Sequence, residues 1–217
     1  MYDRYDESKW SIPLINDSGK YLLDYITKKL FPFPASIHFN KNEKAKECLL
    51  IYAEYMCPLN DKKAKQNENS TSKVFFDIMS DISEQLEYYE TNYNISFIGF
   101  DRDDIVKICV DENESRYLII SDKYICKMHP CNKQEVQLVY LPKVPTFCSK
   151  EVEKKVSNKQ FPMVLHAKCG YYGFGKYMES IWKEELDGGK KTMSEKVRGF
   201  LKRCLEPDED ARRLLYL

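Results

Sequence analysis

The stretch that decides the fold runs from Cys48 to Phe100. It opens with Cys48-Leu-Leu-Ile-Tyr-Ala-Glu-Tyr-Met56 and closes with Asn94-Ile-Ser-Phe-Ile-Gly-Phe100, two apolar runs typical of buried strands. Between them, apolar residues recur at three- and four-residue spacing, which indicates a helix with one apolar face. They are Phe75, Ile78, Met79, Ile82, Leu86 and Tyr89. We expect this helix to pack on a sheet formed by its flanking strands, joined as a right-handed parallel crossover.

The remaining segments extend this core into an α/β (α+β) fold with a mixed sheet. Short strands are predicted at residues 105–110, 116–120, 123–128 and 135–141. Helical patterns follow from residue 177, and Thr192 and Glu195 stand at the spacing of a capping box for the last helix. We therefore predict a single α/β domain over residues 1–217, with residues 177–217 as a helical C-terminal annex.

The composition narrows the classes of protein to consider. Lys plus Arg and Asp plus Glu number 34 each, so no net field draws the whole chain to nucleic acid or to a membrane. No apolar segment approaches the length of a membrane span, and the charged first residues do not resemble a signal peptide. We therefore expect a cytoplasmic protein whose eight cysteines are reduced, as core residues or as metal ligands.

Two Cys/His pairs suggest a metal site. Cys126 and His129 are separated by two residues, and so are His166 and Cys169. Together they would supply four tetrahedral ligands to zinc, and such a site would be structural because no position is left open for water. The alternative is that these are scattered core cysteines of a reduced protein.

Aromatic and basic residues gather near the C-terminus. The run Gly170-Tyr-Tyr-Gly-Phe-Gly-Lys-Tyr177 places four rings among three glycines, and many Lys and Arg residues follow. Rings for base stacking beside cations for phosphate are what RNA contact needs. The alternative is a set of rings under a helix beside a solvated basic face. The RNA-binding candidates are Tyr171, Tyr172, Phe174, Tyr177, Lys190, Lys191, Arg198, Lys202 and Arg203.

Catalytic patterns are sparse. Asp101, Asp103 and Asp104 suggest acid–base chemistry or a cation site, but no second carboxylate cluster is paired with them by motif. The sequence also lacks a Gly-x-Ser-x-Gly elbow and a His-Glu-x-x-His motif. We therefore expect a protein that is not an enzyme and takes no small-molecule substrate.

The segment after the predicted helix resembles the catalytic region of protein kinases. Ile98-Gly-Phe-Asp101-Arg-Asp-Asp-Ile105 is similar to the kinase catalytic loop, and Ile119-Ile-Ser-Asp122 lies where a metal-binding Asp would follow. The run from Ser194 to Pro207 is similar to a late helix of the C-terminal lobe. The chain departs from the family because it has no Gly-rich loop before residue 99, no recognisable strand lysine, no catalytic-loop His and no Phe-Gly after Asp122. The resemblance implies a degenerate pseudokinase.

The first half also resembles the basophilic-leukaemia-expressed protein family, whose fold is similar to that of the cap-binding translation initiation factor. Gly19-Lys-Tyr-Leu-Leu23 is similar to a Gly-Lys-Trp strand of that family. Leu49-Leu-Ile-Tyr52, the polar loop, the helix and residues 95–97 follow its strand–helix–strand order. The resemblance points to the translation apparatus, and the chain is similar in build to a microsporidian dormancy factor bound to idle ribosomes.

Two functions remain open. The first is a non-catalytic cytoplasmic protein that docks on a ribonucleoprotein, most concretely the ribosome with its rRNA and ribosomal proteins, as a hibernation-type factor. The alternative is a pseudokinase-like scaffold that binds another protein. A continuous sheet through residue 141 would count against the scaffold, since a kinase C-terminal lobe is helical.

Overall fold

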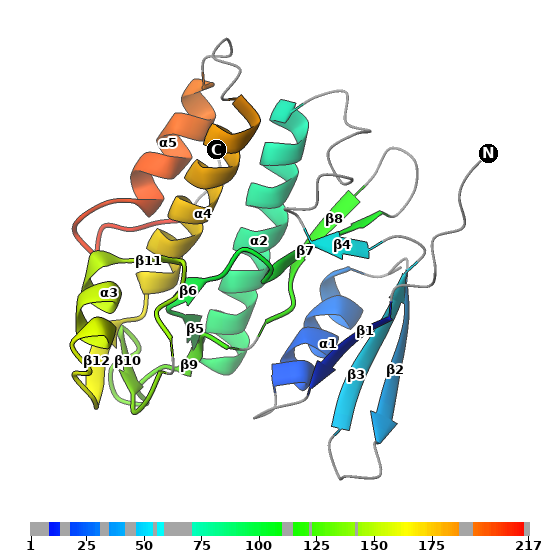
Figure 1. Ribbon diagram of the computed structural model, residues 1–217, viewed down its shortest axis with the longest axis horizontal. Helices are drawn as coiled ribbons and strands as arrows, with labels where there is room; N and C mark the ends of the chain where they lie inside the picture. Colours follow the sequence, from blue (N-terminus) through cyan, green and yellow to red (C-terminus); the bar gives the residue numbers. More distant parts are fainter. Residues whose placement is uncertain are drawn as a thin grey trace. The chain divides into compact units, whose positions relative to one another are not determined.

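The chain is described from a computed structural model that covers residues 9–13, 18–30, 35–41, 47–53, 56–58, 71–109, 115–121, 123–141, 143–186 and 193–214 (Figure 1). Its residues divide into two compact units. The first comprises residues 1–68 and 103–123, and the second comprises residues 69–102 and 124–217. That residues 1–217 form one domain stays a prediction.

The described part of the first unit contains two small antiparallel sheets and one helix. Their strand orders are β1-β3-β2 and β4-β7-β8. The helix buries Leu22, Tyr25 and Ile26, which share one helical face. The elements are β1 (Lys9–Pro13), α1 (Ser18–Lys29), β2 (Ala35–Lys41), β3 (Glu47–Ala53), β4 (Met56–Pro58), β7 (Ile105–Cys109) and β8 (Ser115–Ile119).

The second unit is mainly helical. Its strands form three antiparallel pairs, β5–β9, β6–β11 and β10–β12, and a bridge between Met128 and Val136 joins β9 to β10. The elements are α2 (Thr71–Tyr93), β5 (Ile95–Phe97), β6 (Gly99–Phe100), β9 (Ile125–Lys127), β10 (Glu135–Leu138), β11 (Phe147–Cys148), α3 (Lys150–Ser157), β12 (Met163–His166), α4 (Cys169–Leu186) and α5 (Glu195–Cys204).

The mixed α/β class and the apolar stripe of α2 are confirmed. All six residues predicted for that stripe are buried: Phe75, Ile78, Met79, Ile82, Leu86 and Tyr89. The helix ends at Tyr93, and Asn94 follows at a φ of 52°, a left-handed conformation that Asn tolerates. This turn leads directly into β5.

The parallel crossover and the mixed sheet are wrong. The strand β3 pairs with β1 and β2, whereas β5 pairs with β9 and β6 with β11. Every pairing among the described strands is antiparallel. An apolar run signals a buried strand but carries no information about its partner, and here each of the two runs pairs elsewhere.

The C-terminal helices also differ from the predicted annex. Helix α4 begins at Cys169, eight residues before the predicted start, and it packs against β6 and β11 in the core of the second unit. A Cβ at Gly173 would lie 2.7 Å from the carbonyl oxygen of Phe147, so glycine permits this close approach. Helix α5 is capped by Ser194, whose Oγ accepts from the Val197 N–H, while Thr192 lies outside the described residues.

Within the described ranges, none of the five helices has both the length and the apolar character that crossing a bilayer demands.

Candidate functional site

Asp101 is the centre of a hydrogen-bonded hub in the second unit. It directly follows β6. Its Oδ1 accepts from the backbone N–H and the hydroxyl of Thr146 at 3.0 and 2.7 Å. Its Oδ2 accepts from the Tyr124 hydroxyl at 2.7 Å and lies 3.4 Å from the Lys143 ammonium. The carboxylate therefore fastens the segment before β11 to the end of β6.

The same partners fix the charge of Asp101. Burial acts to raise its pKa, but the hydrogen bonds from Thr146 and Tyr124 and the charge of Lys143 outweigh burial and lower the pKa to about 2. A carboxylate with so low a pKa is a weak general base near neutral pH, because proton acceptance is most effective when the pKa lies near the working pH.

The other two acids of the motif do not join this hub. Asp104 is buried in the first unit, with an oxygen 3.6 Å from the Lys123 ammonium, and Asp103 is exposed there. The predicted acidic cluster at residues 101–104 is therefore divided between the two units.

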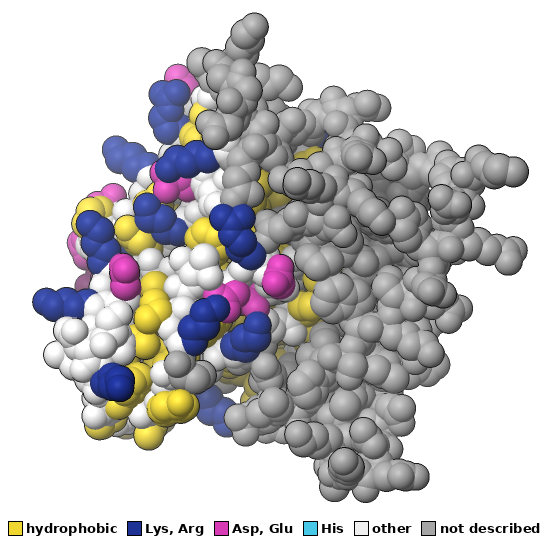
Figure 2. Space-filling model, in the orientation of Figure 1, with side chains coloured by type: hydrophobic (Ala, Val, Ile, Leu, Met, Phe, Trp, Pro, Cys, Tyr) yellow, Lys and Arg dark blue, Asp and Glu magenta, His cyan; other side chains and the backbone are white. Residues whose placement is uncertain are grey.

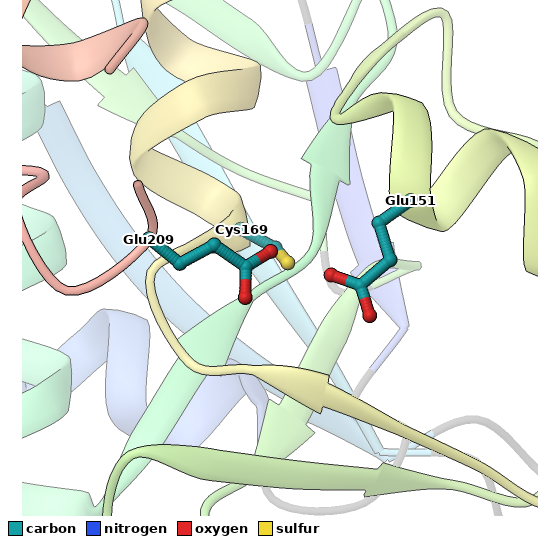
Figure 3. A group of neighbouring side chains, drawn as sticks. All are labelled: Glu151, Cys169 and Glu209. Atoms are coloured by element: carbon teal, nitrogen blue, oxygen red, sulfur yellow. The ribbon is translucent and has the colours of Figure 1, made fainter. Parts of the chain in front are cut away.

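A second polar centre brings together Glu151, Cys169 and Glu209 (Figure 3). Glu151 lies in the first turn of α3, Cys169 begins α4, and Glu209 lies in the segment after α5. One ligand atom from each lies within 4.8 Å of the others. In Figure 3 both carboxyl groups point toward the sulfur. We call these three residues the acid–thiol cluster.

The two carboxyl groups of the acid–thiol cluster share a hydrogen bond. The pKa of Glu209 is raised to about 7, mainly by burial. The hydrogen bond with Glu151 and the negative charge of Glu151 act in the same direction. Burial opposes ionisation of Glu151 as well, but hydrogen bonds from Glu209 and Lys155 lower its pKa. The Lys155 ammonium lies 2.6 Å from Glu151 Oε1. At neutral pH, Glu151 therefore carries the negative charge and Glu209 holds a proton for part of the time.

Arg212 places a buried cation beside the acid–thiol cluster. Its side chain is 4% exposed, and Nη1 lies 3.7 Å from Glu209 Oε1. Nε donates to the carbonyl of Glu206 at 2.9 Å and Nη2 to that of Pro207 at 3.4 Å. The guanidinium also stands 5.0 Å from the centre of the Tyr172 ring. Arg212 thus closes the loop after α5 and holds Glu209 against α3.

The Cys169 thiol is not an activated nucleophile. Burial raises its pKa to about 11, although the Ser149 hydroxyl, 3.8 Å from the sulfur, acts in the opposite direction. A metal ion at the acid–thiol cluster would have to displace the thiol proton and the proton shared by the carboxyl groups. With those protons removed, one thiolate and two carboxylates would be available as ligands.

The four predicted zinc ligands do not come together as a ligand set. Cys126 is buried in β9, whereas His129 is exposed and its Nδ1 accepts from the Cys131 N–H at 3.3 Å. His166 accepts from the Lys168 N–H through Nδ1 and lies 3.2 Å from Asp210 through Nε2. Of the four, only Cys169 belongs to a metal-like group within the described residues. Each imidazole is held by local backbone contacts that sequence spacing does not reveal.

The prediction that the four aromatic rings form an exposed stacking surface is also wrong. Tyr171, Phe174 and Tyr177 are 7%, 0% and 1% exposed, because they lie on the face of α4 that packs into the core. Tyr172 is half-buried under Arg212. These rings therefore pack in the hydrophobic core of the second unit, and little of their surface is exposed for base stacking. The alternative stated from the sequence, rings under a helix, describes them correctly.

The predicted phosphate contacts have a mixed outcome. Arg198 and Lys202 are exposed on α5, and Arg203 is half-buried there. Lys190 and Lys191 lie outside the described residues. A basic face of α5 therefore remains, without the aromatic half of the predicted site.

Sequence reasoning missed Glu90, Glu151, Glu209 and Arg212. Burial raises the pKa of Glu90 to about 7, and its carboxyl accepts a hydrogen bond from the Tyr171 hydroxyl. In the sequence these residues look like ordinary charged surface residues. Only for Glu90, which directly follows Tyr89 of the apolar stripe of α2, did the sequence indicate burial.

No protein-family model matches the chain, and no curated protein matches it. The assignment of a function therefore starts from the geometry described above. That geometry combines a largely helical unit, the Asp101 carboxylate with hydrogen bonds to both of its oxygens, and the acid–thiol cluster beside the buried Arg212.

Proposed function

We propose that this protein is a non-catalytic, kinase-like scaffold of the cytoplasm that binds another protein. The observation that carries the proposal is the architecture of residues 69–102 and 124–217. No continuous sheet runs through residue 141 among the described residues; instead, two-stranded ribbons accompany the helices α2, α4 and α5. A helical lobe of this kind is what the kinase resemblance implies.

Part of the kinase resemblance falls in this unit, while its residues 103–105 and 119–122 belong to the first unit. The helix α2 precedes the loop of Asp101, and α5 coincides with most of the run 194–207 that is similar to a late kinase helix. The helix–loop–helix order expected from the sequence is therefore compatible with the structure. This agreement favours the scaffold over the sheet-based cap-binding resemblance.

The chemistry of Asp101 supports the non-catalytic half of the proposal. Its carboxylate is occupied by Thr146, Tyr124 and Lys143, and its pKa is lowered to about 2. The sequence also lacks the Gly-rich loop and the strand lysine that hold nucleotide in kinases. Asp101 is then a positioning residue that ties β6 to β11.

The test combines nucleotide binding with phosphoryl transfer. A nucleotide at ten times its Kd would stabilise the protein by about 1.4 kcal/mol and raise Tm by about 3 to 6 °C. We expect no such shift with ATP and magnesium, and no transfer of labelled phosphate to the chain or to a generic substrate. Magnesium-dependent transfer that is lost in Asp101→Asn and retained in the exposed-site control Asp103→Asn would overturn the proposal.

One observation favours a second function, docking on a ribonucleoprotein such as the ribosome. Helix α5 carries four basic residues and one acidic residue, and Lys196, Arg198 and Lys202 are exposed. Figure 2 shows Lys and Arg side chains in the region where Figure 1 places α5. Because the neighbouring rings are buried, this contact would be electrostatic and without base stacking.

Cosedimentation with ribosomes across a salt series tests the second function. Docking through α5 predicts binding at low salt that weakens steeply as salt rises. Reversing Arg198 and Lys202 to Glu should reduce the slope of log affinity against log salt by about 2. Protein that remains at the top of the gradient at low salt would exclude this function.

A further inference from the structure

One region of the second unit departs strongly from the neutral charge of the whole chain. Residues 124–168 contain eight lysines and three glutamates and neither arginine nor aspartate, which gives a net charge of +5. Two of the three histidines of the chain also lie here. This region includes β10, α3 and β12. A local positive field is therefore concentrated on one part of an otherwise balanced protein.

Among the described residues, the same region holds most of the exposed large hydrophobic side chains. Val139 and Tyr140 are 74% and 70% exposed, and Val164 is 48% exposed. Among the described residues, the one other large hydrophobic side chain with this degree of exposure is Phe76, at 36%. Val139 and Tyr140 directly follow β10, and Val164 lies on its partner strand β12.

These side chains lie at one end of the antiparallel β10–β12 ribbon. Leu138 at the end of β10 pairs with Met163, so Val139 and Tyr140 lie at the end of the ribbon where β12 begins, and Val164 pairs with Gln137. The Tyr140 ring lies 6.1 Å from that of half-buried Phe161. We call Val139, Tyr140, Phe161 and Val164 the ribbon patch. Figure 2 shows hydrophobic side chains beside Lys and Arg over the part of the unit where Figure 1 has β10 and β12.

Three lysines lie close to the ribbon patch, two of them by sequence position and one by a hydrogen bond. Lys143 is three residues beyond Tyr140, and its side chain is 69% exposed. Lys159 is exposed two residues before Phe161. The Lys155 ammonium donates to the Val164 carbonyl at 2.7 Å, which places a third cation beside the patch. Apolar anchors surrounded by charge are the usual anatomy of a protein-docking surface.

We infer that the ribbon patch is a docking surface for an acidic protein segment that carries an aromatic or aliphatic anchor. The anchor would cover Tyr140 and Val139, and the acidic groups would meet Lys143 and Lys159, since Lys155 is already paired with Glu151. RNA fits less well, because Tyr140 is the one well-exposed ring of the patch and the aliphatic side chains of Val139 and Val164 offer no stacking face. The inference rests on the proposed scaffold function and names the chemistry of its partner.

Fluorescence anisotropy with a labelled peptide tests the inference on the full chain. The probe is a short peptide with a central Leu-Phe pair flanked by glutamates, and the matched peptide has lysine in place of glutamate. We expect the acidic peptide to bind, to weaken as salt rises, and to lose about tenfold in affinity in Tyr140→Ser, the loss typical of an interface anchor. Lys159→Glu should weaken it as well.

The control is Phe76→Ser, which removes an exposed ring outside the patch and should leave binding unchanged. Equal binding of both peptides, or binding that is insensitive to Tyr140→Ser, overturns the inference. So does tighter, Tyr140-dependent binding of an oligouridine competitor, which would make the patch a nucleic-acid surface. Tyr140-dependent dimerisation in sedimentation would assign the patch to a second copy of the chain and would overturn it too.

The failures of the two proposals are distinguishable. Phosphoryl transfer by the chain, with peptide binding intact, would reject the non-catalytic scaffold and keep the docking surface. Loss of peptide binding, with no phosphoryl transfer and a protein partner bound through another surface, would reject the docking surface and keep the scaffold.

Discussion

Arg212→Leu should strongly destabilise the second unit. The substitution removes the guanidinium from two backbone carbonyls, from Glu209 and from the Tyr172 ring, while leucine keeps part of the volume. Breaking a buried ion pair by removing one partner costs about 3 to 5 kcal/mol. Glu209 is 31% exposed and is protonated for part of the time near neutral pH, so the lower value of about 3 kcal/mol applies. The corresponding fall in Tm is about 6 to 12 °C.

Thermal and urea unfolding followed by circular dichroism measure this effect, with Arg213→Leu as the matched control. Arg213 is the exposed neighbour of Arg212 on the same segment, and its Nη1 donates to the carbonyls of Asp210 and Arg212, so its loss should cost about 1 kcal/mol. A second signature comes from pH. Without the positive charge of Arg212, the pKa of Glu209 in the folded protein should rise above 7. The destabilisation should therefore grow between pH 6 and pH 8, because the unfolded chain ionises this carboxyl freely and the folded variant does not.

Equal destabilisation by the two arginine variants would refute the reasoning, since the burial of Arg212 and its contact with Glu209 would then add nothing to stability. A destabilisation of Arg212→Leu that is the same at every pH would separate Arg212 from Glu209 and leave only its contacts with the backbone carbonyls.

Three further predictions follow from the polar centres. The pKa of Glu90 is raised, so stability should fall as pH rises through 4.5 toward 7, by up to about 3 kcal/mol, and Glu90→Gln should flatten that slope in urea titrations. Thr146→Val removes one donor from Asp101 and should cost about 1 kcal/mol above pH 4, with the difference disappearing in acid as Asp101 protonates; Thr146→Ser should retain stability. A zinc ion held by the acid–thiol cluster would be lost in Cys169→Ser and kept in His129→Ala, as measured by elemental analysis. The reverse pattern would place the ion at the predicted Cys/His pairs.

The part of the fold that the sequence made predictable is local. The stripe of α2 was predictable because residues three and four apart in one helix share a face whatever the rest of the chain does. Strand pairing was not, since the runs at residues 48–56 and 94–100 are equally apolar in a parallel crossover and in two separate antiparallel sheets. The pattern predicts that a strand is buried but does not identify its neighbour.

The candidate site was predictable to a smaller degree. Four rings among three glycines have the same composition whether they stack on bases or pack under a helix, and the close approach at Gly173 decides for packing. Glu151 and Glu209 are separated by more than fifty residues and look like surface charges. Their proximity depends on the loop that Arg212 closes, a long-range arrangement without a short sequence motif.

The division of the chain into two units has a consequence for the design of truncated variants. Because β4 pairs with β7, the first unit draws strands from residues beyond α2, so the polypeptide leaves that unit at residue 68 and returns to it at residue 103. A stop codon placed before α2 would therefore release a fragment that lacks β7 and β8, with β4 deprived of its partner. During synthesis, the β4-β7-β8 sheet cannot be completed until the whole of α2 has emerged.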